Sequence, residues 1–191
     1  MPTHSRKTKE TDITATLDVY GKGIAEIRTG VGYFDHMLES FARHALMDIS
    51  LHCTGDLHVD SHHTIEDCGI VLGALLADSV YPIAQIERFG EACIVMDEAC
   101  VQSVLDVCNR PFFVWDMPRL DGALGAFDCE LAEEFFKSLA FNARICLHIV
   151  HKRGHNRHHI IEAAFKSCAL ALRRALAHNT RVQIPSTKGL L

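Results

Sequence analysis

The chain has 191 residues, enough for one sizeable domain or two small ones that share a core. Its formal net charge of −5 offers no general attraction for nucleic acid, and no apolar run is long enough to cross a bilayer. The 8 cysteines lie scattered, so we expect reduced thiols in a cytoplasmic protein rather than a disulfide framework.

In chain order, the first segment with a clear pattern is residues 13–30, which predicts a β-hairpin. Apolar and polar residues alternate at its start, and Gly21-Lys22-Gly23 supplies the turn. Apolar residues at helical spacing predict a helix over about 33–45, a strand follows over 48–60, and a second helix runs from Ser61 to about Ser79.

The second half repeats this order. Strands are predicted over 91–99 and 101–117, a helix over 129–143, a strand over 144–151 and a last helix over 157–177. A shift of 96 carries the motif His-His-x-x-Glu at 62–66 onto the same motif at 158–162. The same shift aligns the apolar faces of the two helices, Ile65, Gly69, Leu72 and Leu76 with Ile161, Phe165, Cys168 and Leu172.

These repeats predict an α+β fold from a duplicated strand-strand-helix-strand-helix unit, with two halves packed into one layered domain. We place the half-repeats at 10–88 and 89–180, followed by a C-terminal tail at 181–191.

The repeated motif combines two adjacent histidines with a glutamate one helical turn later. Residues i and i+4 share a helix face, so His62 and Glu66 could bind one metal ion, whereas adjacent histidines point about 100° apart. Each pair therefore suggests two metals, or one metal and one substrate contact, completed by neighbouring halves or subunits. Imidazole with carboxylate suits Mn, Fe, Ni or Zn. The plain alternative, solvated histidines near a helix start, is weakened because the motif occurs twice at matching points.

The repeat also proposes one further ligand from the first helix of each half. A shift of 98 aligns His36 with Glu134. Without this alignment, Glu134 would be read as a solvated carboxylate and His36 as an ordinary histidine with its hydrogen bonds satisfied.

Several stretches together resemble the imidazoleglycerol-phosphate dehydratase family: "GVGYFDHMLESFARHA", "GDLHVDSHHTIED", "RFG", "MDEA", "NRPFF", "LHI", "HHIIEAAFKS" and "PSTKG". The resemblance runs from about Glu10 to the last residue and includes no separate phosphatase domain, as in the monofunctional form. It implies halves of the ribosomal S5 domain 2-like type, two Mn ions per active site, and a homo-oligomeric shell of 24 subunits with sites between subunits. The implied reaction converts imidazoleglycerol phosphate to imidazoleacetol phosphate and water, in histidine biosynthesis.

The resemblance also assigns metal ligands. One ion would be held by His36, His63, Glu66 and His159, and the other by His62, Glu134, His158 and Glu162. The family often has His at the position of Glu134, so this ligand departs from the family pattern.

Two metals on the two ring nitrogens would bind the substrate as imidazolate, which can expel the adjacent hydroxyl to give a diazafulvene-like intermediate. Glu10 falls on the family's acid/base glutamate; by itself it would be read as a solvated residue near a mobile N-terminus. His36 and His44 are placed as substrate contacts. The resemblance implies that the substrate's phosphate is bound by Arg88, Arg110, Lys166, Ser186, Thr187 and Lys188.

Asp97 and Glu98 match the family as well, but the sequence assigns them no role, and His155 and His178 read as surface histidines. Two other functions fit the metal motif: a dinuclear metallohydrolase of a phosphoester, and a metal-binding oligomer without catalysis. The second leaves Glu10, the two arginines and the Ser-Thr-Lys tail unused.

Overall fold

The computed structural model describes residues 1–189; Leu190 and Leu191, the end of the predicted tail, lie outside the described residues. The first half forms a four-stranded sheet in the order β1-β2-β4-β3. Its strands are β1 (Thr3–Lys7), β2 (Thr11–Asp18), β3 (Ala25–Arg28) and β4 (Asp48–Gly55), and its helices are α1 (Gly32–Ala45) and α2 (His62–Val80). β3 runs parallel to β4, and the other pairs are antiparallel.

The second half has the same topology, with a sheet in the order β5-β6-β10-β7 in which β7 runs parallel to β10. The strands are β5 (Phe89–Met96), β6 (Ala99–Asp106), β7 (Phe112–Asp116) and β10 (Cys146–Arg153), and the helices are α3 (Leu131–Asn142) and α4 (Arg157–Ala175). A small pair, β8 (Ala123–Leu124) and β9 (Phe127–Asp128), precedes α3. The α+β class and the duplication are thus confirmed, with one strand more in each four-stranded sheet than expected and the β8–β9 pair in addition.

The predicted hairpin over 13–30 is wrong, because β4 lies between β2 and β3. The Gly21–Gly23 turn wraps around Asp48 instead. The Asp48 carboxylate accepts hydrogen bonds from the backbone N–H groups of Lys22 (2.7 Å) and Ile24 (2.8 Å), which carries the chain past the start of β4. The single strand predicted over 101–117 is likewise interrupted, at a turn where Asn109 has φ +58°.

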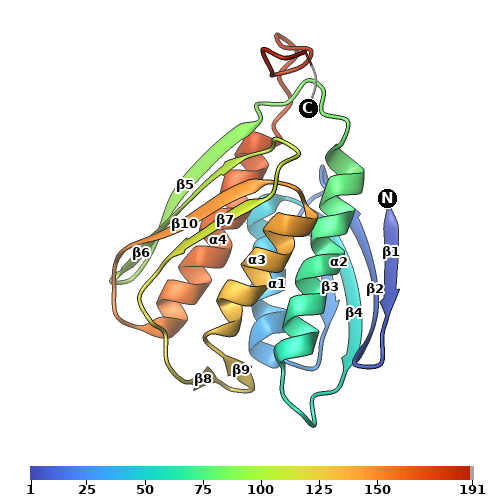
Figure 1. The fold of residues 1–191 in the computed structure, drawn as a ribbon. Helices are drawn as coiled ribbons and strands as arrows, with labels where there is room; N and C mark the ends of the chain where they lie inside the picture. Colours follow the sequence, from blue (N-terminus) through green and yellow to red (C-terminus); the bar gives the residue numbers. More distant parts are fainter. Residues whose placement is uncertain (190–191) are drawn as a thin grey trace.

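The four helices lie between the two sheets (Figure 1). The buried side chains of α1, which are Phe34, Met37, Leu38, Phe41, Ala42 and Ala45, map with the shift of 98 onto buried residues of the second half, Ala132, Phe135, Phe136, Leu139, Ala140 and Ala143. The shift of 96 likewise maps the apolar face of α2 onto that of α4. The helix registers inferred from the repeat are therefore confirmed.

The halves pack through their helices, α2 along α3 and α1 along α4. Two glycines bring α2 close to α3. A Cβ at Gly69 would lie 2.7 Å from the carbonyl oxygen of Phe135, and one at Gly73 would lie 2.6 Å from that of Leu139. No helix within residues 1–189 combines the length and apolar character that a membrane span requires.

Candidate active site

The first His-His-x-x-Glu motif opens α2. His62 Nε2 lies 3.7 Å from Glu66 Oε2, one helical turn away, while the two adjacent imidazoles stand at 73° to each other. His63 turns to the loop after β4, where its Nδ1 lies 3.0 Å from Asp56 Oδ2. Its Nε2 lies 3.8 Å from Glu10 Oε1, so β1 and β2 bring Glu10 to this motif. The hydrogen bond to Asp56 raises the pKa of His63.

The second motif opens α4 and repeats this arrangement. His158 Nε2 lies 3.2 Å from Glu162 Oε2, and the rings of His158 and His159 stand at 81°. Lys166 Nζ lies 2.6 Å from Glu162 Oε1. Burial alone would raise the pKa of Glu162, but the bonds to Lys166 and His158 outweigh it, so the pKa is lowered. Glu162 is therefore held as a carboxylate.

His159 is oriented by the β5–β6 turn. Its Nδ1 lies 2.8 Å from Glu98 Oε2, and its Nε2 lies 3.7 Å from Asp97 Oδ2. Glu98 also accepts hydrogen bonds from the backbone N–H groups of His155 (3.2 Å) and Asn156 (2.8 Å). The hydrogen bond from His159 and that from Asn156 lower the pKa of Glu98 to about 2, and the same contact raises the pKa of His159.

The candidates on the first helix of each half lie differently. His36 on α1 is near enough to Glu162 to help lower the pKa of the Glu162 carboxyl through electrostatic attraction. Burial, and then the charge of Lys166, lower the pKa of His44, which places both α1 histidines toward α4. Glu134 on α3 is partly exposed and pairs with Lys137 at 3.3 Å.

One chain does not gather these groups into a metal centre. Within residues 1–189, no cluster of three or more His, Cys, Asp or Glu side chains could hold a metal ion. The two motifs sit on helices with different neighbours, because α2 packs on α3 and α4 packs on α1. Each motif alone offers one His–Glu pair and one carboxylate-oriented histidine.

The predicted phosphate residues, in contrast, largely come together. Arg88, Arg110, Ser186, Thr187 and Lys188 line a hollow of ≈ 310 Å³, with Cys108 and Asn109. Asp106 holds Arg88 through two bonds of 2.7 and 3.0 Å, and the carbonyl oxygen of Pro185 accepts a third at 2.7 Å, which fixes the tail beside it.

We call this hollow the anion hollow, after the phosphate contacts predicted there; Lys166 does not line it. Arg88 lies at the C-terminal end of α4, where its backbone N–H donates a hydrogen bond to the carbonyl oxygen of Ala175 at 2.8 Å. Nine residues of helix, roughly 14 Å, separate Lys166 from that end. The predicted phosphate contacts therefore lie in two places on one chain.

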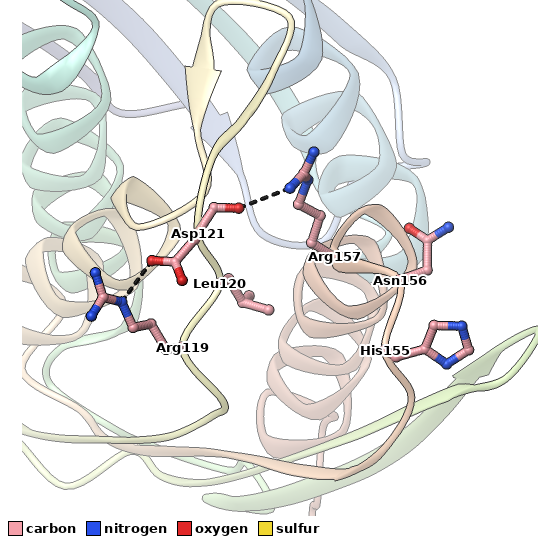
Figure 2. A pocket seen from close by; sticks show the side chains of 6 residues that line it. All are labelled: Arg119, Leu120, Asp121, His155, Asn156 and Arg157. Atoms are coloured by element: carbon pink, nitrogen blue, oxygen red, sulfur yellow. Dashed lines mark hydrogen bonds and ion pairs between the residues drawn. The ribbon is translucent and has the colours of Figure 1, made fainter.

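Another hollow, of ≈ 400 Å³, lies beside the start of α4 and is lined by none of the predicted site residues. Figure 2 shows its lining, with Asp121 between Arg119 and Arg157; Arg119 Nε lies 2.6 Å from the Asp121 carboxylate. The predicted surface histidines His155 and His178 are both exposed.

Sequence reasoning assigned no role to Asp56 or Glu98, which orient His63 and His159. Asp56 lies seven residues before its histidine and Glu98 lies 61 residues before its own, so only the fold brings the second pair together. A signal was present in "GDLHVDSHH" and "MDEA", where carboxylates follow or join strands.

The whole chain is similar to known proteins. A family model described as imidazoleglycerol-phosphate dehydratase matches residues 29–172. Relatives of that name from Wolinella succinogenes and Sulfurimonas denitrificans are 64% identical over 98% of both chains and 59% identical over 100% of both, respectively. The solved dehydratase of Pyrococcus furiosus, described in complex with (S)-C348, has a TM-score of 0.84 at 38% identity, covering 98% of this chain and 100% of that one.

A second solved structure, the dehydratase of Staphylococcus aureus, has a TM-score of 0.82 at 34% identity and covers 93% of this chain and 100% of that chain. The fold and the sequence thus define a carbon–oxygen lyase that eliminates water. The chain belongs to the imidazoleglycerol-phosphate dehydratase family and serves histidine biosynthesis.

Proposed function

We propose that the chain converts imidazoleglycerol phosphate to imidazoleacetol phosphate and water, with the substrate's ring held as imidazolate by two Mn ions. The observation that carries the proposal is the pair of matching groups at the starts of α2 and α4, each with a His–Glu pair one helical turn apart and an oriented second histidine. The family membership of the chain supports the same reaction.

The donor chemistry fits Mn. Each group offers imidazole nitrogen and carboxylate oxygen without thiolate, a mixture that suits Mn, Fe or Zn. We keep the ligand sets that the family resemblance implies, His36, His63, Glu66 and His159 for one ion and His62, Glu134, His158 and Glu162 for the other. When bound, the two ions would supply Lewis-acid polarisation of the ring nitrogens.

The chain's own residues would then move the protons. Glu10, within 3.8 Å of His63 and with its side chain 53% exposed, would give a proton to the hydroxyl leaving the carbon beside the ring. Its carboxylate would then take the proton from the next carbon, so that one water leaves and the resulting enol becomes the ketone. A single carboxylate acting as acid and then base closes the proton balance.

The substrate's phosphate would bind in the anion hollow, where Arg88 and Arg110 offer charged donors and the Ser186–Lys188 turn adds hydroxyls. His44 and Lys166 remain proposed substrate contacts. Along α4, the hollow and the His158 group lie at opposite ends of 19 residues, roughly 28 Å apart, farther than a three-carbon chain can reach.

That separation supports an assembly in which different subunits supply the metal ligands and the phosphate contacts. We propose a homo-oligomer of 24 subunits with active sites between subunits, as the family resemblance implies, working in the cytoplasm and requiring neither nucleic acid nor membrane. Outward-facing apolar side chains on the second sheet, including Phe89, Val95 and Phe112, are available for such contacts.

The test is product formation from imidazoleglycerol phosphate by protein that has been stripped of metal and then supplied with Mn. We expect no turnover after chelation and recovery with Mn. Hydrolysis of a generic phosphate ester, with no turnover of imidazoleglycerol phosphate, would instead establish the metallohydrolase.

A further inference from the structure

The second histidine of each motif presents its Nδ1 to a carboxylate. His63 Nδ1 lies 3.0 and 3.2 Å from the two oxygens of Asp56, and His159 Nδ1 lies 2.8 Å from Glu98 Oε2. An ionised carboxylate can only accept a hydrogen bond, so a neutral imidazole in this position carries its proton on Nδ1. The lone pair is then on Nε2, and that nitrogen is the one free to bind a metal.

The two carboxylates do not come from matching places in the repeat. Asp56 directly follows β4, and the shift of 98 between β4 and β10 aligns it with Gly154. At Gly154, φ is +115° and a Cβ would lie 2.5 Å from Ala99 Cα, so no side chain fits there. The second half therefore cannot use the position that serves the first.

Glu98 comes from the other side of the site. It directly precedes β6, just as Glu10 directly precedes β2, and both strands have 8 residues. A shift of 88 makes Glu98 the repeat counterpart of Glu10. In the first half this glutamate lies 3.8 Å from His63 Nε2, and in the second it bonds His159 Nδ1 at 2.8 Å. Both halves thus place a carboxylate beside Nδ1 of the second histidine, but the carboxylate follows β4 in the first half and precedes β6 in the second. Duplication of one ancestral contact does not explain this difference.

We propose that Asp56 and Glu98 are positioning residues that fix the Nδ1–H tautomers of His63 and His159 for metal binding, and that Asp56 thereby leaves Glu10 free to transfer protons. The inference rests on the proposed function for its consequence, which is metal affinity. Its immediate content, the tautomer, concerns the chain alone and can be measured without metal.

The contacts of Glu98 allow a sharp substitution. Its Oε1 accepts the backbone N–H groups of His155 and Asn156, and its Oε2 faces His159. In Glu98→Gln the amide oxygen keeps the two backbone bonds, which turns the NH₂ group toward His159 Nδ1. A donor at this place favours the Nε2–H tautomer and blocks the metal-binding lone pair.

The experiment uses the full chain with ¹⁵N-labelled histidine, stripped of metal, at about pH 9, where imidazoles are neutral. We expect NMR to show Nδ1–H for His63 and His159 in the unsubstituted protein, and Nε2–H for His159 in Glu98→Gln. Asp56→Ala should remove the Nδ1–H preference of His63 alone. Titration with Mn, followed by the EPR signal of the free ion, should show affinity roughly 10–100-fold lower for both variants.

Asp60→Asn is the matched control, because Asp60 accepts the backbone N–H of His62 at 2.8 Å and an amide oxygen can keep that bond. It should preserve both tautomers and the affinity. An unchanged His159 tautomer in Glu98→Gln would overturn the inference, as would unchanged Mn affinity in both variants. If the unsubstituted protein binds no Mn, the proposed metal function fails, while the NMR result still decides the tautomers.

Discussion

The two halves carry the same ligand motif but surround it differently. In the first, Glu10 lies 3.8 Å from its histidine with the side chain 53% exposed; in the second, its counterpart Glu98 bonds at 2.8 Å and is 31% exposed. The helices kept one register while the turns beside them diverged. A duplicated chain can thus keep one motif in both copies while placing the glutamate beside it differently in each.

We expect metal removal to have the largest effect, because it should affect the proposed ligands of both halves at once. Because adjacent histidines point apart and one chain holds no complete cluster within residues 1–189, we expect metal to bridge subunits. Chelation should abolish turnover and yield smaller species in size-exclusion chromatography, and Mn should restore the large one. A large particle that persists after verified metal removal would show that the protein surfaces alone hold it together.

Glu10→Gln should separate the two repeat-related glutamates. General acid–base groups contribute roughly 10²–10⁴ in rate, so kcat should fall by that factor while bound Mn stays near its normal level. In contrast, Glu162→Gln should lower metal occupancy itself, because an amide is a poorer ligand than a carboxylate. Turnover and bound Mn are measured for both variants; normal turnover by Glu10→Gln would remove Glu10 from the mechanism.

Arg110→Ala tests the anion hollow against the Lys166 end of α4. Hydrogen bonds between charged groups contribute about 1.5–3 kcal/mol, so KM should rise roughly 10–100-fold with metal occupancy unchanged. Lys166→Ala should also disturb Glu162, its partner at 2.6 Å, and so reduce bound Mn. An Arg110→Ala enzyme with normal KM would place the phosphate elsewhere.

Acid should act on activity and on stability in opposite directions. Asp56 and Glu98 raise the pKa of His63 and His159, so protons compete with metal more strongly there, and activity should fall steeply below about pH 6. Excess Mn should move this limb to lower pH.

In metal-free protein the same raised pKa values favour folding at low pH. The stabilisation is fully present below the unfolded pKa of about 6.5 and is lost as pH rises through the higher folded values. The melting temperature of chelated protein between pH 6 and 9 checks this. A rise in melting temperature with pH would contradict it.

Gly73→Ala tests the contact between the halves and should have the smallest effect on the site. Its Cβ would meet the backbone of α3 at 2.6 Å, so we expect a loss of about 1–3 kcal/mol in unfolding free energy. Gly32→Ala is the control, because nothing lies within 4 Å of its Cβ, and alanine favours a helix by up to about 1 kcal/mol. Equal melting temperatures for the two variants would argue against a tight α2–α3 contact.

The sequence predicted the helices and their registers well, because apolar spacing within a helix is a local signal. The spacing of Phe34, Met37 and Phe41 predicts the buried face of α1, and the repeat predicts the matching buried face of α3. The His–Glu pairs of the two His-His-x-x-Glu motifs were equally predictable, because the helix itself fixes the position of a residue relative to its neighbour one turn later.

Strand neighbours and contacts between residues far apart in the sequence were not predictable in this way. β1 was missed because Thr3–Lys7 is polar on both faces and gains its structure by pairing with β2. The hairpin prediction was wrong because Asp48, more than twenty residues away, accepts a hydrogen bond from the backbone of the predicted turn and so places β4 between the two strands. Asp56 and Glu98 acquire their roles from partners that only the folded chain places beside them.

The helices also say something about how such a chain could have arisen. Each helix of one half lies along a helix of the other, α2 on α3 and α1 on α4. A half-length ancestor would have left these faces bare, and a second copy of itself would have been the natural cover. Cutting the present chain in the connection near Ala84 and expressing the two pieces together should therefore recover the fold by complementation, whereas either piece alone should aggregate.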